Sequence, residues 1–195
     1  MRGLDRNLRE WCENEGVRWR RELKLYAYDP LPARLLAQRM KILVISPMEI
    51  PEVDELILQC LLAENAGWSA LTLPVDKGRH LIIYNPTHAA TRYESNVMHE
   101  LAHLLLGHRP IRFHQLSAGL LVREYREADE EAAKYLGGCL QIPARGLDWA
   151  FQRGMTQHEI AEHFGASTQM MRYRCNMTGH GLSGCQAKKR AADLD

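Results

Sequence analysis

Apolar residues recur along this chain with two different periods, which separate predicted helices from predicted strands. Apolar positions at helical spacing predict helices over residues 4–23, 32–39 and 51–64. Short β-rich runs predict strands over residues 42–45, 68–75 and 80–84, and extended backbone over residues 24–28. Asp76, Lys77 and Gly78 lie between the last two strands, so the pattern also predicts a hairpin turn there.

A further helix is predicted from the apolar run between Val97 and Leu106. Thr91 and Glu94 have the spacing of a capping box and are expected to mark the start of this helix. Gly107, followed by Pro110, provides a stop signal. The helix is therefore predicted to be bounded at both ends.

This helix contains an HExxH sequence formed by His99, Glu100 and His103. Two histidines four residues apart lie about 40° apart around a helix axis, so both imidazoles can reach one metal ion. Glu100 projects from the neighbouring side, where a carboxylate can hold a water molecule next to the metal. The pattern supplies two ligands and a base, and this geometry suits zinc.

A catalytic zinc site needs a third protein ligand. The metzincin offsets hold Leu106 and Arg109 where glycine and histidine are required, which excludes that arrangement. His108 is rotated by about 140° from His103 around the helix and is expected beyond its end, as a polar residue near the mouth of the cleft.

A helical segment predicted over residues 124–133 is rich in carboxylates. Glu127, Glu130 and Glu131 share one face of it, which is unfavourable unless water or a cation compensates their charge. A glutamate presented by a second helix to an HExxH helix is the gluzincin arrangement. The spacing leaves all three glutamates open as ligands.

Together these motifs resemble the ImmA/IrrE-type metallo-endopeptidases, in which a helix reading roughly E-x-[EQ]-A-x-x-F-A-A-x-L-L-M-P follows HExxH. The corresponding positions here are Glu130, Ala133, Leu136, Gly137, Gly138, Leu140, Ile142 and Pro143. The resemblance covers roughly residues 30–175 and extends to an F-G-x-S…R-Y-R stretch, here Phe164-Gly165-Ala166-Ser167 and Arg172-Tyr173-Arg174. It implies that Glu130 is the third zinc ligand, with Glu127 and Glu131 as fallbacks.

The predicted fold is a mostly helical α+β minimal zincin, with a small three-stranded sheet beside the HExxH helix and a helix-turn-helix-like pair at the C-terminus. Residues 1–145 are expected to form the metallopeptidase domain, in which residues 1–29 are a helical extension. Residues 146–178 are expected to form the helix-turn-helix-like subdomain, and residues 179–195 a disordered tail. The adjacent Gly137 and Gly138 indicate either close packing of their helix or its early end.

The C-terminal pair is predicted from a capping box formed by Thr156 and Glu159 and from a second helix over residues 167–174. If residues 156–175 contacted DNA, Gln169, Arg172 and Arg174 would lie on the recognition helix. An apolar face on the pair instead favours packing within the peptidase fold, so direct DNA binding is the less favoured reading.

Composition excludes several other classes. The 195 residues are 46% hydrophobic, enough for one good core, and a net charge of +1 gives no overall case for nucleic acid or an anionic membrane. Five scattered cysteines suit reduced thiols. The chain has no apolar run of about 20 residues and no apolar signal-peptide core near its start, so a cytoplasmic protein without membrane contact is expected.

The expected chemistry is zinc-dependent hydrolysis of a peptide bond, with Glu100 as the base. Tyr173 is the predicted oxyanion donor, ahead of His108 and His114, and Glu127 is expected to orient a zinc-bound histidine. An edge strand, over residues 68–75 or 80–84, is expected to pair with the substrate backbone.

The resemblance implies that the partner is a protein substrate, a helix-turn-helix transcriptional repressor that controls stress-response or mobile-element genes. The competing prediction is a non-catalytic regulatory protein, or one partner of a toxin and antitoxin pair, that keeps the peptidase fold. An intact base at Glu100 argues against this alternative, because a purely structural metal site does not need one.

Overall fold

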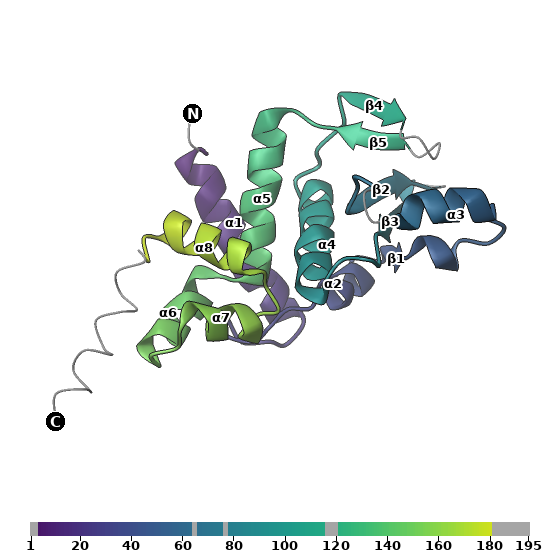
Figure 1. The fold of residues 1–195 in the computed structure, drawn as a ribbon. Coiled ribbons are helices and arrows are strands. Elements are labelled where there is room, and N and C mark those ends of the chain that lie inside the picture. Colours follow the sequence, from purple (N-terminus) through teal and green to yellow (C-terminus); the bar gives the residue numbers. More distant parts are fainter. Residues whose placement is uncertain (1–3, 64–65, 76–77, 116–120, 181–195) are drawn as a thin grey trace.

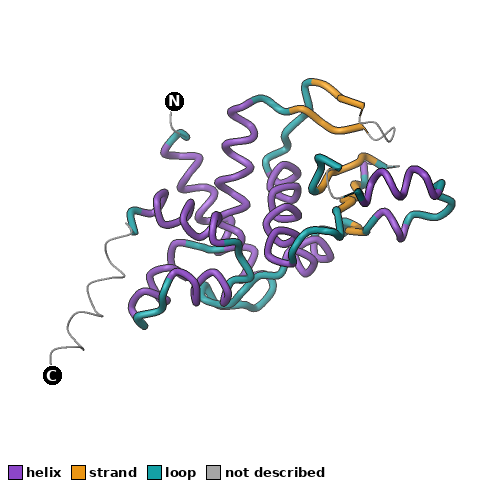
Figure 2. Tube along the Cα trace, in the orientation of Figure 1, coloured by secondary structure: helices purple, strands orange, loops and turns teal. Residues whose placement is uncertain are grey.

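The fold is built around one central helix, with a small sheet on one side of it and most of the other helices on the opposite side (Figure 1). The computed structural model describes residues 4–63, 66–75, 78–115 and 121–180. Its helices are α1 (Arg6–Glu22), α2 (Ala33–Arg39), α3 (Glu55–Leu62), α4 (Ala90–Leu105), α5 (Glu127–Gln141), α6 (Ala144–Gln152), α7 (Gln157–His163) and α8 (Thr168–Thr178). Its strands are β1 (Leu43–Ile45), β2 (Ala70–Pro74), β3 (His80–Tyr84), β4 (Arg112–Gln115) and β5 (Leu121–Glu124), and Figure 2 shows that helices predominate.

The predicted three-stranded sheet is confirmed, in the order β1-β3-β2. β1 pairs with β3 in parallel, and β2 pairs with β3 in an antiparallel ladder that places Thr72 opposite Ile82. Because β3 is central, the prediction that residues 80–84 form a free edge is wrong. β2 is at an edge of the sheet. Of the predicted hairpin turn, Asp76 and Lys77 lie outside the described residues.

The HExxH sequence lies in α4, which packs on the sheet through one face and on α5 through another (Figure 1). Val97, Met98 and Leu101 are fully buried there and belong to the main core. The predicted capping box is wrong, since α4 begins at Ala90 and Ala89 provides no side-chain cap. Glu94 instead accepts a hydrogen bond from the backbone N–H of Ala33, at 2.7 Å, and so fixes the start of α2.

The two glycines of α5 reflect close packing and not an early helix end, because the helix continues to Gln141. A Cβ atom built on Gly137 would lie 3.4 Å from the carbonyl oxygen of Met98 in α4. A Cβ atom on Gly138 would lie 2.8 Å from Cδ of Arg174 in α8. α5 therefore packs against the backbone of α4 at Gly137 and against the buried Arg174 at Gly138.

The N-terminal helix α1 lies along α5 (Figure 1). At Gly16 a Cβ atom would be only 2.6 Å from the carbonyl oxygen of Cys139, so the two backbones touch. Arg20, 1% exposed, donates hydrogen bonds to the carbonyl oxygens of Leu140 at 2.8 Å and Gln141 at 3.1 Å. α1 thus satisfies carbonyl groups that the end of α5 leaves without helical partners.

Several elements differ from the sequence-based expectation. Residues 24–28 form turns and no strand; Tyr28 there stacks between Tyr26 and Trp149, with ring centroids 5.2 Å and 5.0 Å apart. Helix α6 and the β4–β5 hairpin were not predicted. The segment over residues 124–133, expected to be helical throughout, begins in β5 and becomes helical at Glu127.

The C-terminal helix pair is present as α7 and α8, and its capping box is confirmed. The backbone N–H of Thr156 donates to Glu159 at 2.7 Å, and that of Glu159 donates to the Thr156 hydroxyl at 3.2 Å. Of the three residues considered as possible DNA contacts, Arg174 is not accessible to DNA. Arg174 is fully buried and donates to the carbonyl oxygen of Ile142 at 2.8 Å and to Glu13 at 2.6 Å.

Two further observations concern the ends of the chain and the membrane. Most of the predicted tail, residues 181–195, lies outside the described residues. Within the described part, every helix is too short or too polar to cross a bilayer. 

Alanine substitutions at two glycines test the packing of α5. Gly16→Ala should lower the free energy of unfolding by about 1–3 kcal/mol, because its methyl group would overlap backbone. Gly137→Ala is the matched control; its methyl group is in ordinary contact, so stability should change by less than about 1 kcal/mol. Urea denaturation of both variants measures the difference, and equal losses would contradict this packing.

Candidate metal centre

Three side chains from two helices converge beside the centre of α4. The Nε2 atoms of His99 and His103 are 3.0 Å apart, and Glu130 from α5 places its carboxylate oxygens 3.1 Å and 3.6 Å from them. One ligand atom from each of the three lies within 4.8 Å of the others. Donors this close can share one metal ion.

The structure separates Glu130 from the other two glutamates considered. Glu127 and Glu131 lie on the same helix but outside the group formed by Glu130 and the two histidines. Glu131 instead acts on Tyr173, where its charge contributes to a raised pKa. Position on α5 therefore favours Glu130 as the third donor.

The group is buried on one side and open on the other. The His103 side chain is 2% exposed, that of His99 30% and that of Glu130 46%. Hydrogen bonds from His103 and His99 hold the pKa of Glu130 well below its usual range, so it is an anion at neutral pH. The open side leaves space for a further ligand.

Glu100 is oriented by a residue that sequence reasoning missed. Thr72 of β2, 1% exposed, donates its hydroxyl to the Glu100 carboxylate at 2.6 Å. Burial raises the pKa of Glu100, and this hydrogen bond opposes the rise. A carboxylate with a raised pKa accepts a proton more readily than an exposed one. The only local signal for Thr72 was one polar residue between Leu71 and Leu73.

His108 contacts His103 on the side away from Glu130, because the chain turns back at the end of α4. Gly107 adopts a φ of +66°, and the backbone N–H of His108 returns to the carbonyl oxygen of His103 at 3.1 Å. This turn closes the helix, as its stop signal predicted. It brings the Nδ1 atoms of His108 and His103 to 3.0 Å.

The outer nitrogen of His108, Nε2, lies 3.7 Å from a carboxylate oxygen of Asp129. Burial lowers the pKa of His108, so its neutral form can accept from His103 through Nδ1 and face Asp129 through Nε2–H. The expectation that Glu127 orients a ligating histidine is therefore corrected: His108 and Asp129 lie in that position. The His108 side chain is 11% exposed.

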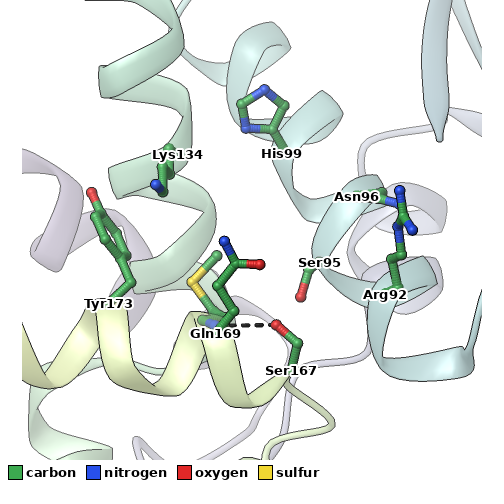
Figure 3. A pocket seen from close by; sticks show the side chains of 9 residues that line it. Arg92, Ser95, Asn96, His99, Lys134, Ser167, Gln169 and Tyr173 are labelled. Carbon is green, nitrogen blue, oxygen red and sulfur yellow. Dashed lines mark hydrogen bonds between the residues drawn. The ribbon is translucent and has the colours of Figure 1, made fainter. Parts of the chain in front are cut away.

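One tyrosine contacts this group, and a second lines the pocket beside it. Tyr125, which was not predicted, stacks on His103 with ring centroids 3.9 Å apart. Tyr173, the predicted oxyanion donor, lines a pocket with His99, and its ring lies 4.7 Å from the Lys134 ammonium group (Figure 3). Burial raises the pKa of Tyr173 to about 12, so it is a protonated donor at neutral pH. Its catalytic role stays a prediction. The side chain of His114 lies outside the described part.

An HExxH helix that meets a glutamate from a second helix places the chain in the class of metallopeptidase folds. A family model confirms this independently: the M78 peptidase model, described as the IrrE N-terminal-like domain, matches residues 54–176, more than half of the chain. The chain belongs to this family, as its resemblance to the ImmA/IrrE peptidases indicated. No curated protein and no solved structure matched it.

Replacing His108 tests its support of His103. We expect His108→Ala to weaken metal binding by about 10–100-fold, because the Nδ1–H of His103 loses its partner. Glu127→Ala is the control on the α5 side and should leave affinity unchanged. Competition with a chromophoric chelator measures both constants. Unchanged affinity in His108→Ala, or equal losses in the two variants, would contradict the assignment.

Proposed function

We propose that this protein is a zinc-dependent endopeptidase that acts in the cytoplasm on a specific protein, a helix-turn-helix transcriptional repressor. The observation that carries the enzymatic part is the convergence of His99, His103 and Glu130 beside a hydrogen-bonded Glu100. Family membership supports peptidase chemistry. The choice of a repressor rests on the resemblance to the ImmA/IrrE peptidases.

The donor set fits zinc. Zinc bonds of about 2.0–2.2 Å to nitrogen and oxygen, at tetrahedral angles, put neighbouring donors about 3.3–3.6 Å apart. Here the two imidazole nitrogens are 3.0 Å apart, and the two Glu130 oxygens lie 3.1 Å from His99 Nε2 and 3.6 Å from His103 Nε2, respectively. Two imidazoles and one carboxylate are also the protein ligands typical of a catalytic zinc site that keeps one open position. We therefore assign His99, His103 and Glu130 as the zinc ligands.

When bound, zinc would supply Lewis acidity toward a water molecule and the scissile carbonyl group. Glu100 would accept the proton of the attacking water and later give it to the leaving amine. The hydrogen bond from Thr72 fixes one Glu100 oxygen and leaves the other free for this transfer. Tyr173 remains our proposed oxyanion donor, and its raised pKa keeps the phenol protonated.

Substrate backbone is proposed to pair with β2. This strand pairs with β3 alone among the described strands, and its Thr72 side chain contacts Glu100. A peptide paired with β2 on the side away from β3 would therefore run past the base.

The competing proposal is a regulatory binding protein that keeps the fold without catalysis. The buried hydrogen bond between Thr72 and Glu100 favours the enzyme, because metal ligation alone requires neither residue. Direct DNA binding has less support, since Arg174 is enclosed by Ile142 and Glu13.

Two substitutions separate ligation from catalysis. Glu100→Gln should retain zinc but lower the cleavage rate by about 10²–10⁴-fold, because the amide cannot accept the proton. Glu130→Ala should lose zinc. Elemental analysis of the purified proteins and a cleavage assay measure these effects. Full activity in Glu100→Gln would overturn the assigned base, and full zinc content in Glu130→Ala would move the third ligand.

The inactive Glu100→Gln variant also tests the substrate class. It should trap an intact repressor in cells, whereas the wild-type protein should generate a new N-terminus in that repressor. Affinity capture and mass spectrometry of new N-termini detect both. Cleavage confined to proteins of another class would overturn the proposed substrate, and a cellular effect unchanged by Glu100→Gln would support the binding-protein alternative.

A further inference from the structure

A pocket of about 620 Å³ opens directly beside the metal centre, between α4, α5 and α8 (Figure 3). His99 belongs both to its wall and to the metal-binding group. Arg92 from α4 and Lys134 from α5 also line it, and its described lining contains no aspartate or glutamate. The volume is sufficient for a large side chain. The pocket therefore presents positive charge next to the proposed scissile bond.

Helix geometry places the charge of Lys134 about one turn away from the proposed metal ligand Glu130. Lys134 follows Glu130 by one turn of α5, and Ser95 precedes His99 by one turn of α4. Four residues, slightly more than one turn, correspond to a rise of about 6 Å. A substrate residue whose backbone lies at the metal centre can therefore extend its side chain along both helices into the pocket.

Lys134 is available for such a side chain. Its ammonium group lies 4.7 Å from the centroid of the Tyr173 ring, which keeps it on this side of α5. No carboxylate forms an ion pair with it in the described part of the chain. Glu131 acts electrostatically on Tyr173 but does not line the pocket.

The other walls suit the rest of an acidic side chain. Gln169 lines the pocket and supplies an amide that can donate to a carboxylate, whereas the Ser95 hydroxyl already donates to the Gln141 side chain at 3.0 Å (Figure 3). Met170 and the Tyr173 ring supply apolar surface for methylene groups. Arg92 donates to the Ser69 hydroxyl at 3.0 Å and has further donors.

We infer that this pocket selects substrates with an acidic side chain, glutamate in particular, on the residue next to the scissile bond. This inference rests on the proposed peptidase function and adds to it the chemical class of one substrate residue. An arginine or lysine at that substrate position would meet the like charges of Lys134 and Arg92.

The test uses four peptide hydroxamates. They differ only in the side chain next to the hydroxamate, which is that of glutamate, glutamine, leucine or lysine. Calorimetry on the zinc-loaded full chain gives their dissociation constants. The glutamate compound should bind about three- to tenfold more tightly than the glutamine compound, as expected for a partly exposed charge pair. This advantage should shrink as salt is added.

Charge reversal gives the sharper comparison. Lys134→Glu should remove the preference for glutamate and favour the lysine compound, whereas Arg145→Glu, an equal charge change on α6 outside the pocket, should keep the wild-type order. Equal binding of all four compounds, or an unchanged order in Lys134→Glu with zinc retained, would overturn the inference and leave the peptidase proposal intact. If no compound bound the zinc-loaded wild-type protein, both proposals would fail.

Discussion

The metal centre depends on the short distance between α4 and α5. At Gly137 the backbone of α5 lies so close to Met98 and His99 that a methyl group would just make contact. Glu130 begins this helix and has to reach two imidazoles on its neighbour. Close packing of the two helices at one position of α5 therefore sets the geometry at another, two turns away. Gly16 allows a still closer approach on the α1 side, where a methyl group would overlap the carbonyl group of Cys139.

Two buried arginines hold the opposite end of α5. Arg20 from α1 donates to Leu140 and Gln141, and Arg174 from α8 donates to Ile142. Cations suit the negative end of a helix dipole, and the carbonyl groups there need donors. Burial lowers the pKa of Arg20 to about 10, which still leaves it charged at neutral pH. The first and last described helices thus secure the helix that supplies the third metal donor.

Local sequence patterns predicted what local interactions determine. Hydrophobic period identified most helices, the three-stranded sheet and the HExxH helix, and family resemblance singled out Glu130. Predictions failed where contacts with residues distant in sequence determine the structure. Glu94 had the spacing of a capping residue for Thr91, but it accepts a hydrogen bond from α2 instead. The contact between Thr72 and Glu100, and that between His108 and His103, depend on the packed fold and on one turn. β4 and β5 are short and rich in polar residues, so the sequence there lacks the apolar pattern that predicts strands.

The β4–β5 hairpin connects the two donor helices, and its base is closed. Ile111 donates its backbone N–H to the carbonyl oxygen of Glu124 at 2.8 Å, and the ladder pairs Arg112 with that same residue. The chain therefore leaves α4 and returns to α5 from nearly one point, whatever the length of the segment between the strands. Phe113, 56% exposed, shows that the hairpin already offers apolar surface to solvent. Changes in length there can alter the exposed surface of the hairpin while the base of the ladder, and with it the entry of the chain into α5, stays in place.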